Sequence, residues 1–133
     1  MHKRNETIEN YLESIYLLDK KGPVHAIDIV HYFNYSRPTV SVAIKQMQKN
    51  GYIVVTNNII KLTDSGLKIA LEIYERHQLI AEILVKMGVD PKVASADSCK
   101  IEHDLSRESF EAIKKACRWI EKHEKEHSKD KNK

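Results

Sequence analysis

Three residues in the last third of the chain have types and a spacing that suit metal binding. Cys99, Glu102 and His103 stand at positions i, i+3 and i+4 of a segment predicted to be helical, so their side chains share one helix face. A thiolate, a carboxylate and an imidazole together form a half-site for Fe²⁺, Mn²⁺, Co²⁺, Ni²⁺ or Zn²⁺. One helix cannot complete a coordination shell, so a metal here must link helices.

Other segments offer further candidate ligands. Asn10 and Glu13, at i and i+3, share a face of the predicted first helix, and His77 lies beside an apolar run in a long helix. Taken singly, each residue has a simpler explanation. A histidine on such a helix face is commonly a structural residue held by hydrogen bonds, and Cys99 can be a small buried hydrophobic residue. The grouping of Cys99, Glu102 and His103 together with His77 favours a metal site.

The elements that must position these residues can be predicted from apolar periodicity. Spacings of three and four residues predict helices over 6–19, 25–33 and 37–49, with Ser36 capping the third and Pro38 in its first turn. In the second helix, Ile27 is expected to face inward with Ile29, Val30 and Phe33. The period then changes, and 52–55 and 59–62 are predicted to be two strands of a small hairpin. Helices are expected again over 64–87, 90–104 and from 106 to about 123.

Three helices, a hairpin and a return to helix are the order of a winged helix-turn-helix, so the fold is predicted to be mainly α. In that fold the third helix enters the DNA major groove and the hairpin lies along the backbone. The alternative is a solvent-exposed helix face with no binding role, because almost any surface helix carries similar residues. The candidate DNA contacts are Ser36, Arg37, Pro38, Thr39, Ser41, Val42 and Lys45 around the third helix, with Asn57 and Asn58 in the hairpin turn.

Charge and composition narrow the classes of function. The chain has 133 residues and a net charge of +3, and residues 1–62 carry eight Lys/Arg against five Asp/Glu, which mildly indicates a polyanionic partner. With four glycines and no Gly-rich phosphate loop, nucleotide chemistry of the Walker or Rossmann kind is disfavoured. No apolar run approaches membrane-span length, the N-terminus lacks the apolar core of a secretory signal, and two cysteines make no disulfide framework. We therefore expect a cytoplasmic protein with no membrane partner.

Several segments together resemble a known family. They are ENYLESIY at 9–16, SRPTVSVAIKQMQKNGYI at 36–53, LTDSGLKIA at 62–70, ERHQL at 75–79 and CKIEHDLS at 99–106. The chain resembles the diphtheria toxin repressor family of metal-activated transcriptional repressors, and within it the short manganese transport regulators. The resemblance implies a homodimer on a palindromic DNA operator, with metal as co-repressor. It also implies a DNA-binding domain at 1–73 and an all-helical dimerisation and metal-binding domain at 74–123. The tail at 124–133 is polar without apolar periodicity, so we expect it to be disordered.

The resemblance also implies two metal sites that link the first helix to the fourth and fifth helices. Carried over by position, the first site would use Asn10, Cys99, Glu102 and His103. The second would use Glu13, His77 and Glu102, with Cys99 contributing. The implied cofactor is Mn²⁺ or Fe²⁺, with Co²⁺, Ni²⁺ or Zn²⁺ as substitutes.

The chain departs from the family pattern at positions that bear on metal choice. Asn10 stands where the family has Met or Asp, and Cys99 is the residue of the iron-type members, where the manganese regulators carry Glu. Ala81 and Ser95 stand where iron-type members have ancillary Glu and His ligands, which brings the second site closer to the manganese layout.

Two other functions stay open on the residues alone. A winged-helix regulator could sense oxidants through Cys99 without metal. A small metallohydrolase could use Cys99, Glu102 and His103 as ligands, but the sequence shows no second carboxylate, nucleophile or substrate cleft. We therefore expect no enzymatic activity and no small-molecule substrate.

Overall fold

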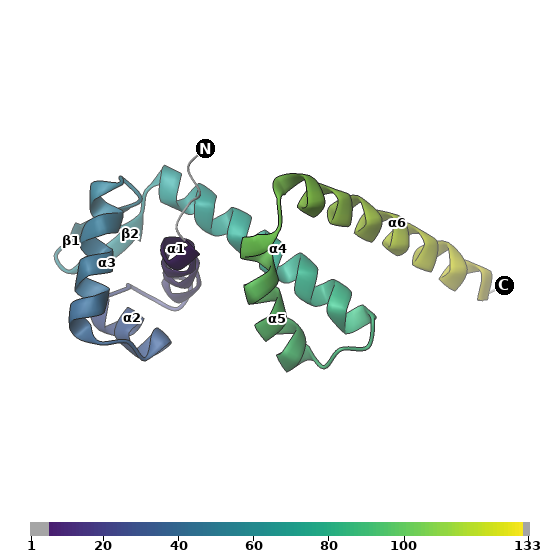
Figure 1. Cartoon of the computed structure of the whole chain (residues 1–133), viewed down its shortest axis with the longest axis horizontal. Helices are drawn as coiled ribbons and strands as arrows, with labels where there is room; N and C mark the ends of the chain where they lie inside the picture. Colours follow the sequence, from purple (N-terminus) through teal and green to yellow (C-terminus); the bar gives the residue numbers. More distant parts are fainter. Residues whose placement is uncertain (1–5, 132–133) are drawn as a thin grey trace. The chain divides into compact units, whose positions relative to one another are not determined.

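The computed structural model describes residues 6–131, apart from the side chains of residues 103 and 125–131. Two compact units divide the chain, residues 1–75 and residues 76–133, and each is described by itself. The element order is α1 (Glu6–Asp19), α2 (Ala26–Phe33), α3 (Arg37–Lys49), β1 (Ile53–Thr56), β2 (Ile59–Leu62), α4 (Asp64–Lys86), α5 (Pro91–Asp104) and α6 (Arg107–Lys131) (Figure 1).

The first unit has one apolar core shared by its helices and its hairpin. Buried side chains recur at helical spacing along α1 and α3, which is why these segments form amphipathic helices with one face against the core. The hairpin joins this core because alternate residues of its strands face inward. The core residues are Ile8, Tyr11, Leu12, Ile15, Val24, Ile29, Val40, Ala43, Met47, Ile53, Ile60, Ile69, Ala70 and Ile73.

Local signals set the start of α3 and the turn of the hairpin. The Ser36 hydroxyl accepts a hydrogen bond from the Thr39 backbone N–H at 3.3 Å, which caps α3. Strands β1 and β2 pair antiparallel from Ile53 opposite Leu62 to Thr56 opposite Ile59. The two residues between the strands, Asn57 and Asn58, have φ of 52° and 64°, the left-handed conformation that a two-residue hairpin turn requires.

The start of α4 is packed tightly against the loop that follows α3. Thr63 donates its backbone N–H to the Tyr52 carbonyl at 3.0 Å and its hydroxyl to the Gly51 carbonyl at 2.6 Å. The Thr63 hydroxyl also accepts the Gly66 N–H at 3.2 Å, which caps α4. A Cβ at Gly66 would overlap the Tyr52 carbonyl, so only glycine fits there.

The second unit consists of the C-terminal part of α4 with α5 and α6. Asp90 caps α5, accepting the Lys92 N–H at 3.2 Å, and Pro91 occupies its first position. Ser106 caps α6, accepting the Ser109 N–H at 3.0 Å. Among the side chains that the structure describes in this unit, the buried ones are Ile80, Ala94, Ser98, Glu102, Phe110 and Cys117.

The mainly helical fold with a winged helix-turn-helix first unit is confirmed, and two expectations are corrected. Helix α6 continues to Lys131 rather than ending near residue 123. Its last residues are rich in Glu and Lys, which have high helix propensity even in a segment that lacks apolar periodicity. Of the tail expected to be disordered at 124–133, residues 132–133 lie outside the described residues. Ile27 is 38% exposed rather than turned into the core. In the described part of the chain, no helix combines the length and the apolar character needed to cross a membrane.

Candidate functional site

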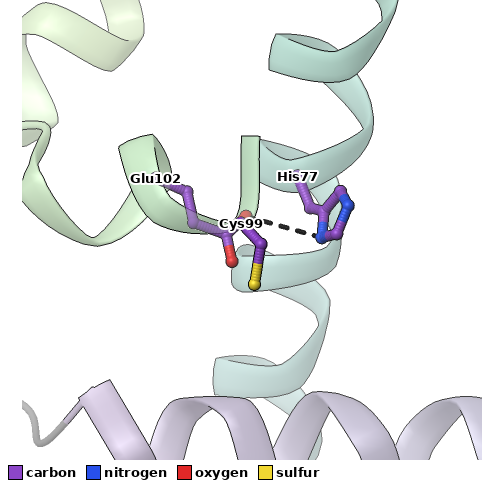
Figure 2. Close-up of side chains that lie close together, drawn as sticks. All are labelled: His77, Cys99 and Glu102. Carbon is purple, nitrogen blue, oxygen red and sulfur yellow. Dashed lines mark ion pairs between the residues drawn. The ribbon is translucent and has the colours of Figure 1, made fainter. Parts of the chain in front are cut away.

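Three of the predicted metal ligands converge within the second unit. His77 extends from α4, and Cys99 and Glu102 extend from α5, with their side chains pointing toward one another (Figure 2). A potential ligand atom of each residue lies within 4.8 Å of those of the other two. The i, i+3 spacing of Cys99 and Glu102 puts both on one face of α5, as predicted. The cluster therefore offers one nitrogen, one sulfur and one carboxylate oxygen to a common point.

The electrostatics of the cluster suit a cation. Glu102 is fully buried, and its Oε2 lies 3.9 Å from Nδ1 of His77, whose side chain is 22% exposed. Burying a carboxylate is costly unless positive charge or hydrogen bonds compensate it. Cys99 is half-buried, so the cluster stays accessible from one side. A divalent metal fits this donor set, because it supplies the charge and accepts all three donor types.

The other ring nitrogen of His77 has a different neighbour. Its Nε2 lies 3.3 Å from the hydroxyl oxygen of Ser95 on α5. Hydrogen bonding at one nitrogen of a histidine determines which nitrogen is left to bind a metal. The sequence reasoning did not predict this contact, although Ser95 precedes Cys99 by four residues, a spacing that places both on one face of α5.

The remaining predicted ligands are Asn10, Glu13 and His103. Asn10 and Glu13 lie in α1 of the first unit, where Glu13 is buried and Asn10 is half-buried. The side chain of His103 lies outside the described residues. Their participation in a metal site stays a prediction.

The second cysteine differs chemically from Cys99. Cys117 is buried on α6 in a cavity of about 190 Å³, beside Glu82 and Glu121. Burial raises the pKa of the Cys117 thiol above its usual value, the nearby Glu121 and Glu82 carboxylates raise it further, and Lys86 partly opposes them. Cys117 therefore stays a neutral thiol at physiological pH, which disfavours it as a metal ligand.

Three of the predicted DNA contacts line a hollow in the first unit. Arg37, Ser41 and Lys45 recur every four residues along α3 and line a hollow of about 600 Å³. Its remaining walls come from α2, α3 and β1, and include the exposed Ile27. Two cations beside a concave apolar wall suit a phosphate backbone that passes close to base edges.

The other predicted DNA contacts occupy varied surroundings. The Ser36 and Thr39 hydroxyls lie 2.7 Å apart and bond each other at the start of α3, next to Pro38. Val42 is 66% exposed on the same helix. The asparagines of the hairpin turn, residues 57 and 58, are also exposed. The contact of these side chains with DNA stays a prediction.

Comparison with known protein families decides the identity of the chain. Residues 4–59 match the family model "Iron dependent repressor, N-terminal DNA binding domain", and residues 63–130 match "Iron dependent repressor, metal binding and dimerisation domain". The chain belongs to the iron-dependent repressor family. This is the diphtheria toxin repressor family, so the resemblance predicted from the sequence is confirmed, including its manganese transport regulator branch.

Individual relatives agree with the family assignment. The chain is 35% identical over 114 residues to the HTH-type transcriptional regulator MJ0568 of Methanocaldococcus jannaschii, covering 83% of this chain and 91% of the relative. It is 33% identical over 112 residues to the transcriptional regulator MntR of Salmonella typhimurium, covering 83% and 71%.

Solved structures share the fold. The metal-dependent transcriptional regulator MtsR superposes with a TM-score of 0.78 at 25% identity, covering 88% of this chain. The manganese regulator SloR superposes with a TM-score of 0.75 at 22% identity, covering 90% of this chain. The chain spans 55% of the length of both of these proteins. The shared region therefore contains the DNA-binding and metal-binding folds but not the rest of those longer chains.

Proposed function

We propose that this family member is a metal-dependent transcriptional repressor that binds a palindromic DNA operator as a homodimer. The observation that carries the proposal is the convergence of His77, Cys99 and Glu102, with Glu102 fully buried, in a chain whose first unit is a winged helix-turn-helix. A dimerisation domain in the matched family model supports the homodimer. The metal requirement follows because the cluster brings together donors that a divalent cation would hold.

The residues of the proposed metal site have different roles. His77, Cys99 and Glu102 would hold the metal in the second unit, and Asn10, Glu13 and His103 are proposed as further ligands. A bound divalent cation supplies positive charge that compensates the carboxylates. Because Asn10 and Glu13 belong to α1, their recruitment would bias the orientation of the DNA-binding unit toward one state.

The thiol at position 99 bears on which metal is used. Thiolate sulfur is a soft donor that favours Fe²⁺, Co²⁺ or Zn²⁺ over Mn²⁺, which prefers carboxylate, carbonyl and water oxygens. We therefore propose Fe²⁺ as the preferred physiological metal, with Mn²⁺ binding more weakly. Replacing the sulfur with oxygen in Cys99→Glu should move the preference toward Mn²⁺.

Anaerobic fluorescence anisotropy tests the proposal. Chelator-stripped protein is titrated onto labelled DNA selected from a random pool by the metal-loaded protein, with Mn²⁺, Fe²⁺, Co²⁺ or Zn²⁺ added separately. We expect tight, sequence-specific binding only when metal is present. Binding that ignores both metal and chelator would refute metal dependence, and its loss on mild oxidation would favour an oxidant sensor acting through Cys99 instead.

A further inference from the structure

The two ring nitrogens of His77 face different groups of α5. Nδ1 lies 3.9 Å from the buried Glu102 carboxylate, and Nε2 lies 3.3 Å from the Ser95 hydroxyl oxygen. Figure 2 shows the first of these contacts as a dashed line beside Cys99. One nitrogen is thus directed at the ligand cluster, while the other is directed at a residue that is no part of it.

The chemistry of imidazole gives this arrangement a consequence. A neutral imidazole carries one N–H, and only the other nitrogen has the lone pair that a metal needs. Without metal, the Glu102 carboxylate near Nδ1 favours the hydrogen on Nδ1, and the Ser95 hydroxyl can donate to Nε2. When a metal takes the lone pair of Nδ1, the hydrogen stands on Nε2, and the Ser95 hydroxyl oxygen accepts it.

We propose that Ser95 is a positioning residue that accepts the Nε2–H of metal-bound His77 and so directs Nδ1 to the metal. Ser95 and Cys99 are one helical turn apart, so the same face of α5 supplies a ligand and the group that orients a second ligand on α4. The proposal rests on the proposed metal site and adds to it a residue that need not touch the metal.

Three variants separate orientation from general stability. Ser95→Ala removes the hydroxyl, Ser95→Thr keeps one, and Ser98→Ala is the matched control, because the Ser98 hydroxyl donates to the Ser95 carbonyl and not to His77. The first measurement is the tautomer of His77 in the Zn²⁺-loaded protein, which also shows which ring nitrogen binds the metal, from long-range ¹H–¹⁵N correlations of the imidazole ring. The second is Zn²⁺ affinity, by competition with a chromophoric chelator.

We expect the Nε2–H tautomer to dominate in wild type, Ser95→Thr and Ser98→Ala, and to lose its dominance in Ser95→Ala. Zn²⁺ affinity should fall about 10-fold in Ser95→Ala, the lower end of the range for lost orienting groups, because Ser95 is exposed and water can partly replace it. Ser95→Thr should restore most of the affinity.

A His77→Ala background distinguishes the ways in which the reasoning can fail. If Ser95 acts through His77, Ser95→Ala should cause no further loss of Zn²⁺ affinity in that background. An equal loss in both backgrounds, or an unchanged tautomer and affinity in Ser95→Ala alone, would overturn the positioning role. Equal Zn²⁺ affinity in wild type and His77→Ala would instead refute the metal site on which the proposal rests.

Discussion

Replacing the buried carboxylate of the cluster should uncouple the stability of the protein from metal. Glu102→Gln keeps the size and shape of the side chain but removes its charge from a fully buried position 3.9 Å from His77. Gln is a much weaker ligand, so we expect metal affinity to fall at least roughly 100-fold. The variant should still fold, because a neutral amide is easier to bury than a carboxylate.

The size of the effect follows from binding linkage. At a metal concentration 100 times the wild-type Kd, binding stabilises the native state by about 2.7 kcal/mol. With affinity 100-fold lower, the same concentration only equals the Kd, and the stabilisation falls to about 0.4 kcal/mol. For a chain of this size, 1 kcal/mol corresponds to about 4 °C in Tm, so metal should raise Tm by about 11 °C in wild type and about 2 °C in the variant.

Thermal unfolding followed by circular dichroism, with and without Zn²⁺, measures both numbers. Glu111→Gln is the matched control, because it makes the same charge change at an exposed position of α6 in the same unit. The control should keep the full metal-induced shift. An equal shift in Glu102→Gln and wild type would show that Glu102 is no ligand and would refute the site.

Four further predictions concern other parts of the chain. Lys45→Ala should lower the slope of log affinity against log salt by roughly one, measured by anisotropy at several salt concentrations, whereas an unchanged slope would place Lys45 off the phosphates. Gly66→Ala should destabilise the protein by about 1–3 kcal/mol in urea denaturation, because the added methyl overlaps a backbone carbonyl. Burial raises the pKa of Tyr11, and Tyr35 in the turn before α3 raises it further, so the unfolded phenol ionises first and wild-type stability should fall above about pH 10. Urea denaturation at pH 7 and 10.5 should show a smaller fall in Tyr11→Phe, where the raised pKa of Cys117 still contributes, and an equal fall in both proteins would contradict the prediction. Iodoacetamide at pH 7.5 should alkylate Cys99 faster than Cys117, and Zn²⁺ should protect only Cys99, as read by mass spectrometry; equal protection of both thiols would contradict the ligand assignment.

Most of the helical architecture could be predicted because it depends on local patterns. Helix α3 was predicted with the observed bounds, since Ser36 and Pro38 mark its start and Asn50 and Gly51 mark its end. Strand β1 begins one residue later than predicted, at Ile53. The shift arises because Tyr52 donates its N–H to the Met47 carbonyl and accepts from Thr63, contacts that periodicity does not report.

Only part of the candidate site could be predicted, because some of its contacts depend on tertiary packing rather than on local sequence. The spacing of Cys99 and Glu102 is a property of one helix and can be found in the sequence. The position of His77 opposite them depends on how α4 packs against α5, so residue type could mark His77 as a candidate ligand but local spacing could not place it beside Cys99 and Glu102. The contact from Ser95 to His77 is tertiary as well. The resemblance singled out Ser95 only as a departure from the iron-type ligand pattern, and its contact with His77 could not be read from the sequence.

The boundary between the two units falls inside a continuous helix, which has a consequence for folding cooperativity. Helix α4 runs from Asp64 to Lys86, and the division lies between Glu75 and Arg76. The backbone hydrogen bonds from residue i to residue i−4 therefore cross the division. Fraying of the helix on one side removes hydrogen-bond partners from residues on the other side. Because restarting a helix is costly, local unfolding is discouraged from stopping at the boundary. Because α4 is continuous, an interaction that opposes local unfolding of the metal-binding unit also opposes local unfolding of the adjoining part of the DNA-binding unit.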